Sequence, residues 1–470
     1  MKKNDKIIIL LIIGLLGTVL TWFVECGSYQ DGLFISNGII RAGLFDYLLI
    51  IYYALYYKAS TIFYLFVLGG FYGIVSQTKG YRKLVGNTVK LIRGREIPTL
   101  LITTLVIGLW TSFTNEILST LVVIPFIITV FLKRGKDRLT ALSAAFGGIF
   151  IGLFGQMLGT YGVGEILRLM GLTVKDGIGF KIAMFVLAYG LYNLFAILHI
   201  RNQEDVVNHT KYDMFLTEKL DETNVKKIRR QKIWPTILIL SLVSLLGIIA
   251  YINWNESFNV VLFDDLMTKV ESVQIDDIPV VTKIFGSFTA FGKWNDLLPL
   301  AFGLIVAAII IAILNKVSIG DALTNFGEGA KKISKLVGIY LLVMAIFVLS
   351  YYFPWPVTLI NTVFGSGKFS LFSILLAGIL AGMLLVDSEY LGYIFGTYLL
   401  ANFADHLIAT SLLMHFGYAM SMLIAPTSFV LMMGLTYLDI PYKNWLRYIW
   451  KFALAILVVI ILLVAIIVYV

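Results

Sequence analysis

Two glutamates stand deep inside apolar stretches that are long enough to enter a membrane. Glu116 lies within the apolar stretch 97–132, and Glu389 lies within the apolar stretch 370–404. A charged side chain at the centre of a bilayer costs about 2.5–3.5 kcal/mol on insertion scales, so such carboxylates are candidates for binding a solute, an ion or a proton. The alternative interpretation is that both glutamates reach the membrane surface and are simply solvated. The neighbouring polar residues that we include in the candidate site are Thr114, Asn115 and Ser388.

A second set of polar residues accompanies residues that interrupt helices. Pro426 falls within an apolar stretch and is followed directly by Thr427 and Ser428. Proline removes a backbone N–H and frees a carbonyl oxygen, and the two hydroxyls add further ligands beside it. Gln156, next to Gly155, is the corresponding polar position in the first half of the chain. The competing interpretation is an ordinary proline kink, at which Ser and Thr bond back to the helix.

The composition places these residues in a membrane protein. Of the 470 residues, 59% are hydrophobic and 14% are charged, and several apolar runs reach the roughly 20 residues that cross a bilayer as a helix. This apolar composition excludes a soluble enzyme. The single cysteine, Cys26, excludes a disulfide-stabilised secreted domain. We assign the net charge of +9 to cytoplasmic loops rather than to binding of nucleic acid. No Walker motif or metal-ligand spacing is present, so we expect no enzyme activity, no cofactor and no metal centre.

The distribution of basic residues predicts which stretches cross the membrane. Basic clusters at 79–95 and 133–138 flank the stretch 97–132, so both of its ends face the cytoplasm and it must form a helical hairpin with Glu116 near its tip. The stretch 370–404 is also apolar with a polar centre, Asp387-Ser388-Glu389, and the count of crossings predicts that it enters from the outside. We expect an all-α multi-pass protein with about nine spans, its N-terminus inside and its C-terminus outside. The predicted spans are 7–26, 59–78, 139–160, 180–200, 233–253, 297–315, 336–353, 407–437 and 448–470, with a short polar segment 316–335 between the sixth and the seventh.

The order of these predicted elements repeats. Two spans, a hairpin and two spans occur in residues 1–200, and the same order returns in residues 297–470 with the opposite starting side. Residues 201–253 form a cytoplasmic loop and a linker helix, and residues 254–296 form an acidic extracellular loop. Inverted repeats with paired broken segments are typical of secondary transporters, which bind their solute near the midplane at these breaks.

Several motifs resemble a known group of transporters. The run Ala425-Pro426-Thr427-Ser428, continued by Leu431-Met432, Leu435, Tyr442, Trp445 and Arg447, resembles the C-terminal signature of the YfcC-type and C4-dicarboxylate anaerobic carrier families of the ion transporter superfamily. The segment Phe326-Gly327-Glu328-Gly329-Ala330 is also similar to a segment of that group. The chain departs from the family at the first tip, where Asn115-Glu116 stands in place of two glutamates. Because of this departure, the resemblance does not identify the coupling ion or the substrate of this chain.

The resemblance implies a secondary active transporter in a bacterial cytoplasmic membrane. The expected solutes are small organic anions, such as dicarboxylates, or amino acids. The expected mechanism is an elevator, coupled to sodium or protons as a symporter or working by exchange as an antiporter. A sodium ion at the paired breaks would be the only metal. The expected partners are the lipid bilayer and a second copy of the chain in a homodimer. The alternative function is a channel, or a non-transporting membrane subunit that docks a partner.

Overall fold

A computed structural model shows a helical membrane protein. It describes residues 5–114, 116–158, 163–202, 212–215, 232–275, 278–286, 289–365 and 368–469. Among these residues, six helical stretches are long and apolar enough to cross a bilayer, and shorter apolar helices accompany them. The small amount of sheet lies in two antiparallel hairpins, β1 (Gly27–Gln30) with β2 (Leu33–Ser36) and β3 (Gln274–Ile275) with β4 (Ile278–Pro279). The predicted all-α membrane fold is therefore confirmed.

The first half of the chain contains one helical hairpin and one broken helix. The hairpin consists of α5 (Glu96–Thr114), η1 (Ile117–Val122) and α6 (Ile124–Lys133). The broken helix consists of α7 (Arg138–Phe154) and α8 (Val163–Leu169). The other helices of this half are α1 (Asp5–Leu20), α2 (Leu44–Tyr57), α3 (Ala59–Gln77), α4 (Lys79–Leu91) and α9 (Ile178–Arg201).

The second half contains the same two features in the same order. The hairpin consists of α18 (Leu371–Leu384) and α19 (Ser388–Asn402), and the broken helix of α20 (Leu407–Ile424) and α21 (Phe429–Tyr437), with the short η3 (Ala404–His406) between them. The remaining helices are α15 (Leu298–Leu314), α16 (Ile319–Tyr352), α17 (Trp355–Phe364) and α22 (Tyr442–Tyr469). The first hairpin arm ends at Thr114 and Leu384, and the first part of the broken helix ends at Phe154 and Ile424, so both pairs lie 270 positions apart.

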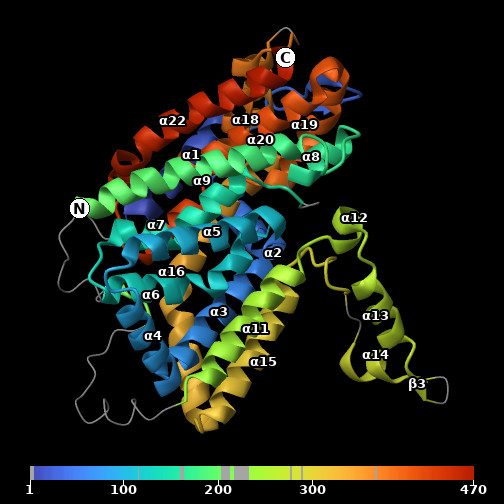
Figure 1. Ribbon diagram of the computed structural model, residues 1–470. Helices are drawn as coiled ribbons and strands as arrows, with labels where there is room; N and C mark the ends of the chain where they lie inside the picture. Colours follow the sequence, from blue (N-terminus) through green and yellow to red (C-terminus); the bar gives the residue numbers. More distant parts are fainter. Residues whose placement is uncertain are drawn as a thin grey trace.

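A linker joins the two halves. It begins with α11 (Trp234–Ile249), which packs against α15, and continues into a lobe formed by α12 (Trp254–Phe258), α13 (Leu262–Glu271) and α14 (Val280–Phe285). Figure 1 shows this lobe extending to one side of the helical body. The Lys293 ammonium lies 2.6 Å from the Asp264 carboxylate and holds the pKa of that carboxyl below its usual value. The acidic loop 254–296 is thus a folded lobe with an ion pair of its own.

Both hairpins are closed at the ends opposite their tips. In the first, the Arg134 guanidinium lies 2.5 Å from the Glu96 carboxylate, which joins the end of α6 to the start of α5. In the second, the rings of Phe369 and Phe403 lie 6.4 Å apart, on either side of the α18–α19 pair. The helical hairpins expected within 97–132 and 370–404 are therefore present.

Small residues let the first hairpin arm pack closely against the broken helix in each half. On α7, a Cβ added at Gly152 would lie 2.6 Å from the backbone oxygen of Gly108 on α5. On α18, a Cβ added at Gly378 would lie 2.8 Å from the backbone oxygen of Met414 on α20. Close backbone approach at small residues is a usual means of packing helices in a bilayer, where lipid removes the hydrophobic drive between them.

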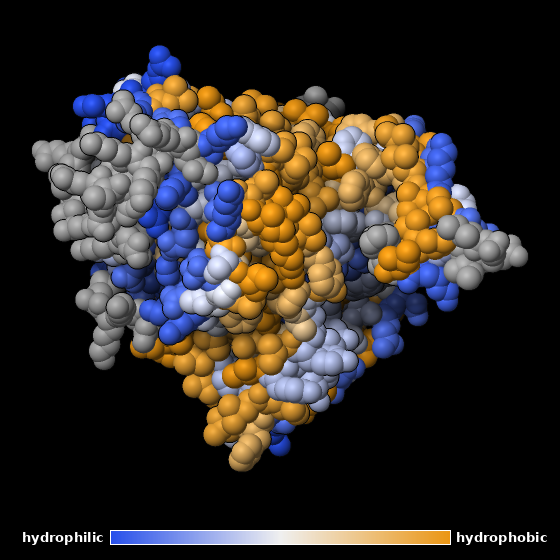
Figure 2. Space-filling model, turned by 90° about the horizontal axis from the view of Figure 1, so that it is seen from below, coloured by the Kyte–Doolittle hydropathy of each residue, from blue (hydrophilic) through white to orange (hydrophobic). Residues whose placement is uncertain are grey.

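The helices form two groups in space. In the upper part of Figure 1, α18–α20 and α22 lie with α8 and α9, and in the lower part α3 lies with α4, α11 and α15. The contacts agree, because α8 packs on α19 and α9 on α22, whereas α3 packs on α15 and α16. The face seen in Figure 2 carries a broad apolar surface between polar margins. Exposed side chains such as Phe302 and Ile313 are suited to lipid rather than water.

The polar segment 316–335 is continuous with the span that follows it. Residues 319–335 form the first half of α16, a single helix of 34 residues. Ser318 caps its start by accepting a hydrogen bond from the backbone N–H of Asp321 at 3.1 Å. Gly329 then packs against Gly73 of α3, while charged side chains such as Lys331 remain exposed. The polar residues mark the outer face of an amphipathic helix.

Candidate functional site

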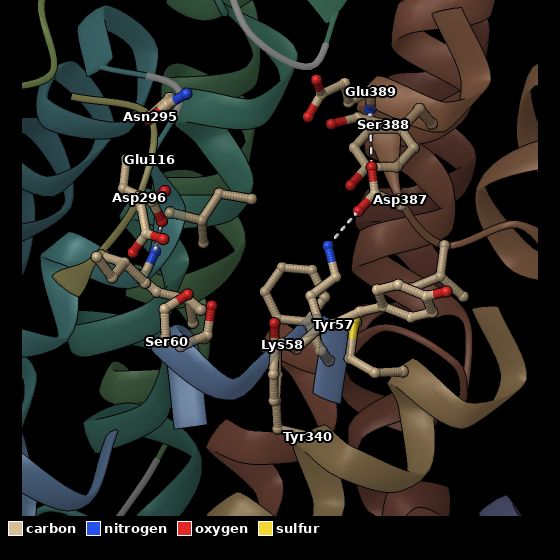
Figure 3. Close-up of a pocket in the computed structure, with 18 residues that line it drawn as sticks. Tyr57, Lys58, Ser60, Glu116, Asn295, Asp296, Tyr340, Asp387, Ser388 and Glu389 are labelled. Carbon is tan, nitrogen blue, oxygen red and sulfur yellow. Dashed lines mark hydrogen bonds and ion pairs between the residues drawn. The ribbon is translucent and has the colours of Figure 1, made fainter. Parts of the chain in front are cut away.

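The tips of the two hairpins face one cavity of about 320 Å³ (Figure 3). Glu116 lies on one side of it, and Asp387, Ser388 and Glu389 lie on the other. Lys58, from the junction of α2 and α3, reaches in between them. Segments that are far apart in the sequence thus bring their charged side chains to a single place.

The tip of the first hairpin is held by its own polar side chains. The Glu116 carboxylate accepts a hydrogen bond from the backbone N–H of Leu118 at 3.0 Å and so caps η1. The Thr114 hydroxyl donates to the backbone oxygen of Trp110 at 2.9 Å and accepts from the N–H of Glu116 at 3.3 Å. Thr114 is buried and shapes the tip, whereas Glu116 is half-buried and lines the cavity.

The tip of the second hairpin uses the same device with a different carboxylate. One oxygen of Asp387 accepts hydrogen bonds from the backbone N–H groups of Glu389 at 3.0 Å and Tyr390 at 3.2 Å, and so caps α19. The preceding Val386 is buried and has φ of 64°, a left-handed conformation that is unfavourable for a β-branched residue. Backbone strain of this kind persists where the surrounding structure enforces it, often at functional sites.

Lys58 connects the second tip to the helices of the other group. Its ammonium lies 2.9 Å from the second carboxylate oxygen of Asp387, and 5.3 Å from the centre of the Phe347 ring on α16. Both partners of the ion pair are largely shielded, since their side chains are 26% and 20% exposed. An ion pair in such a place is screened less by water and salt than one on the surface.

Negative charge exceeds positive charge around the cavity. Asp296, which is half-buried, caps α15 by accepting from the backbone N–H of Leu298 at 2.6 Å. With Glu116, Asp387 and Glu389, it gives four carboxylates in the cavity lining against the single ammonium of Lys58. Three of the four cap helix N-termini, whose partial positive charge offsets part of the excess. The cavity therefore has room and charge for a cation beyond Lys58.

The second helix break is held by the residues of the C-terminal signature. Because Pro426 has no N–H, the backbone oxygen of Met422 loses its helical partner, and the hydroxyl of Ser428 donates to it at 2.6 Å. The next two oxygens are also free of the helix. The Trp445 indole N–H donates to that of Leu423 at 2.9 Å, and the Tyr442 hydroxyl donates to that of Ile424 at 2.5 Å. Three consecutive freed carbonyls thus each have a side-chain donor.

Both breaks are also hydrogen-bonded to the neighbouring hairpin arm. At the second break, the Thr427 hydroxyl donates to the backbone oxygen of Met383 at 2.6 Å. At the first break, the backbone N–H of Met157 donates to the backbone oxygen of Ser112 at 2.9 Å, and the Ser112 hydroxyl donates back to the oxygen of Gly155. Each break is therefore tied by hydrogen bonds to the hairpin arm beside it.

The predicted site residues fall into two sets. Glu116, Ser388 and Glu389 line the cavity together. The others, which lie at the breaks or within the first tip rather than in the cavity lining, are Thr114, Gln156, Pro426, Thr427 and Ser428. Gln156 is buried, and its side-chain oxygen has no hydrogen-bond partner within the described part of the chain. Asn115 lies outside the described residues.

Sequence reasoning missed three charged residues of the cavity, Lys58, Asp296 and Asp387, although Asp387 is the direct neighbour of the predicted Ser388. Lys58 is the only charged residue between Asp46 and Lys79, so its isolation in apolar sequence was a usable signal. Asp296 precedes α15 and resembles an ordinary helix cap, which gave no signal of a site. Tyr340 and Tyr418, also in the lining, look in sequence like any other apolar helix residue.

Comparison with known proteins places the chain in a family. The structure of the YdaH transporter of Alcanivorax borkumensis is 14% identical, with 98% of both chains covered and a TM-score of 0.41. The structure of Neisseria gonorrhoeae MtrF, described as illuminating a class of antimetabolite efflux pumps, is 12% identical, covers 98% of this chain and 94% of that one, and has a TM-score of 0.39. No curated protein matches the sequence. Residues 4–469 match the family described as C4-dicarboxylate anaerobic carrier. The chain therefore belongs to the C4-dicarboxylate anaerobic carrier family of membrane transporters.

Proposed function

We propose that the chain is a secondary transporter of solutes that carry an ammonium group, such as amino acids, and that the solute binds in the cavity between the hairpin tips. The observation that carries the proposal is the excess of carboxylates around that cavity, four against one ammonium. A solute ammonium fits between Glu116, Asp296 and Glu389, and the carboxylate of an amino acid fits beside Lys58.

The charge of the cavity disfavours a dicarboxylate. Two unit charges about 5 Å apart, in a medium of effective dielectric constant about 20, interact by roughly 3 kcal/mol. A dicarboxylate would bring two negative charges close to several carboxylates, and the one ammonium available is already paired with Asp387. The ammonium group of a solute would instead be attracted by these carboxylates, with an interaction energy of the same order. The family description names C4-dicarboxylates, so this chain would differ from that description in its solute.

Lys58 gives the cavity a means of linking solute binding to movement. We propose that Lys58 is paired with Asp387 when no solute is bound, and that the carboxylate of an entering amino acid competes with Asp387 for the Lys58 ammonium. Loss of the ion pair would release the second hairpin from the α2–α3 junction. The hairpins and broken helices could then move against α3, α15 and α16, as the predicted elevator mechanism requires.

Coupling and assembly are parts of the same proposal. The side-chain oxygen of Gln156, which has no partner among the described residues, is the position that we propose for a coupling sodium ion. Coupling to protons and exchange of solutes are the alternatives. The homodimer and the orientation with the N-terminus inside remain predictions of the sequence.

Uptake by proteoliposomes tests the proposal. Purified protein would be offered labelled arginine, ornithine, alanine and succinate, each with a sodium gradient, a proton gradient or the same solute preloaded. We expect accumulation of at least one amine-bearing solute and none of succinate. Glu116→Gln and Glu389→Gln should lower this uptake at least tenfold, whereas Glu328→Gln, an exposed change on α16 outside the cavity, should leave it unchanged.

Two results would contradict the proposal. Accumulation of succinate without any amine-bearing solute would show that the excess of carboxylates does not select the solute. Flux that only runs down its gradient under all three conditions would indicate a channel, the alternative function.

A further inference from the structure

A second cavity, of about 650 Å³, lies away from the hairpin tips. Its walls are apolar and come from four elements, represented by Tyr72 of α3, Leu84 of α4, Phe126 of α6 and Leu245 of α11. Val122 and Val123, at the end of η1, complete the wall on the side of the first hairpin. We refer to this cavity as the α4–α11 groove.

The groove has the length of one leaflet of a bilayer. Its lining on α11 extends from Ile237 to Ile248. At 1.5 Å of rise per residue, these positions are about 16 Å apart along the helix. The hydrocarbon core of a bilayer is about 30 Å thick, so each leaflet contributes roughly 15 Å. An acyl chain that enters from the surface can therefore lie along the whole groove.

Two exposed basic side chains lie where the groove begins on α11. The start of α4 meets the start of α11, because a Cβ added at Gly80 would lie 2.7 Å from the hydroxyl of Thr236 and 3.4 Å from the backbone oxygen of Lys232. Trp234, which is 57% exposed, stands at the same end of α11, and exposed tryptophan is typical of the membrane interface. The exposed basic residues at this end, which we call the basic rim, are Lys79 of α4 and Lys232, which precedes α11.

The basic rim is available to an anion. Neither Lys79 nor Lys232 forms an ion pair with another described residue. Each Lys or Arg near a membrane surface raises the affinity for anionic lipid about fivefold. Charge complementarity thus favours a negatively charged headgroup at this end of an apolar groove.

We propose that the α4–α11 groove binds one acyl chain of an anionic phospholipid, whose phosphate lies against the basic rim. The apolar lining takes the chain, and the side chains of Lys79 and Lys232 take the headgroup. The lipid would then stand between the first hairpin, which supplies Val122 and Phe126, and the helices α3, α4 and α11 on the other wall. Its presence would change the surface along which the first hairpin meets those helices.

Lipid titration followed by native mass spectrometry tests this site. Delipidated protein in detergent would be titrated with phosphatidylglycerol or with phosphatidylcholine of the same acyl chains. We expect the first phosphatidylglycerol to bind at least tenfold more tightly than the first phosphatidylcholine. The combined variant Lys79→Gln and Lys232→Gln should remove this preference. The matched control is Lys331→Gln and Lys335→Gln, at two exposed positions on α16, which should keep it.

A second variant addresses the groove itself. Ser241 lines the groove and Leu242, its neighbour on α11, does not. Ser241→Trp fills the space and should abolish the tight binding event, whereas Leu242→Trp adds the same ring outside the groove and should retain it. Equal affinities of the wild-type protein for the two lipids would overturn the proposal. So would tight binding that survives Ser241→Trp in a variant whose melting temperature equals that of Leu242→Trp.

Discussion

Lys58 and Asp387, which are 329 positions apart in the sequence, form an ion pair of 2.9 Å at the tip of the second hairpin. Asp387 simultaneously caps α19 with its other oxygen. One carboxylate therefore holds the second arm of the hairpin together and ties the tip to the α2–α3 junction. This makes the pair the most direct link between charge in the cavity and the position of the tip.

A double-mutant cycle measures this link. Lys58→Met leaves the shielded carboxylate of Asp387 without its cation, and we expect it to lower the free energy of unfolding by about 1–3 kcal/mol. Asp387→Asn keeps a good cap on α19 but leaves Lys58 unpaired. The double variant should be more stable than the sum of the two single changes predicts, by at least about 1 kcal/mol. Additive effects on the unfolding of the purified protein would show that the pair contributes nothing.

The tryptophan of the C-terminal signature should matter through its N–H. Trp445 is fully buried, and its indole donates to the freed backbone oxygen of Leu423. Trp445→Phe leaves that oxygen without a donor, which costs about 1–3 kcal/mol. Trp450→Phe, on the same helix at a side chain that is 51% exposed, is the matched control. We expect the first variant alone to lower the melting temperature, and equal losses would contradict the assignment.

The contact of α16 with α3 should not tolerate an added methyl group. A Cβ at Gly329 would lie 2.1 Å from the backbone oxygen of Gly69 and 2.7 Å from the Cα of Gly73, and backbone atoms cannot yield as a side chain can. Gly329→Ala should therefore destabilise the protein by about 1–3 kcal/mol. Gly338→Ala on the same helix has open space around it, so the better helix propensity of alanine should leave stability equal or higher. Thermal unfolding of the two variants gives the comparison.

The hydrogen bond from Thr427 to Met383 should control the second hairpin tip. Thr427→Val keeps the shape of the side chain and removes the donor at 2.6 Å. We expect faster amide exchange at residues 385–390 and weaker apparent affinity for the transported solute. Thr427→Ser restores a hydroxyl and should restore both properties. Unchanged exchange in Thr427→Val would mean that the tip is held without this bond.

Much of the fold was readable from particular residues. The apolar stretches fixed the membrane setting, because a chain with this composition cannot bury its apolar surface in water. Basic clusters on both sides of 97–132 required a hairpin, and Pro426 required a break, since proline cannot continue the hydrogen-bonding pattern of a helix. The sequence did not show that most of 316–335 shares one helix with the seventh span, because the glycines of α3 that pack against this part of α16 are distant in the sequence.

The candidate site was only half readable. Glu116 and Glu389 stood out because a carboxylate in apolar sequence is costly and therefore seldom accidental. Thr427 and Ser428 stood out equally, yet the Ser428 hydroxyl bonds an oxygen that the break frees, and the Thr427 hydroxyl bonds the neighbouring hairpin arm. What the sequence determined by itself was which segments enter the membrane and where they break, since those depend on local composition. Only the tertiary structure could bring Lys58 and Asp296 to the two tips, because charges on separate helices meet through packing that no local pattern records.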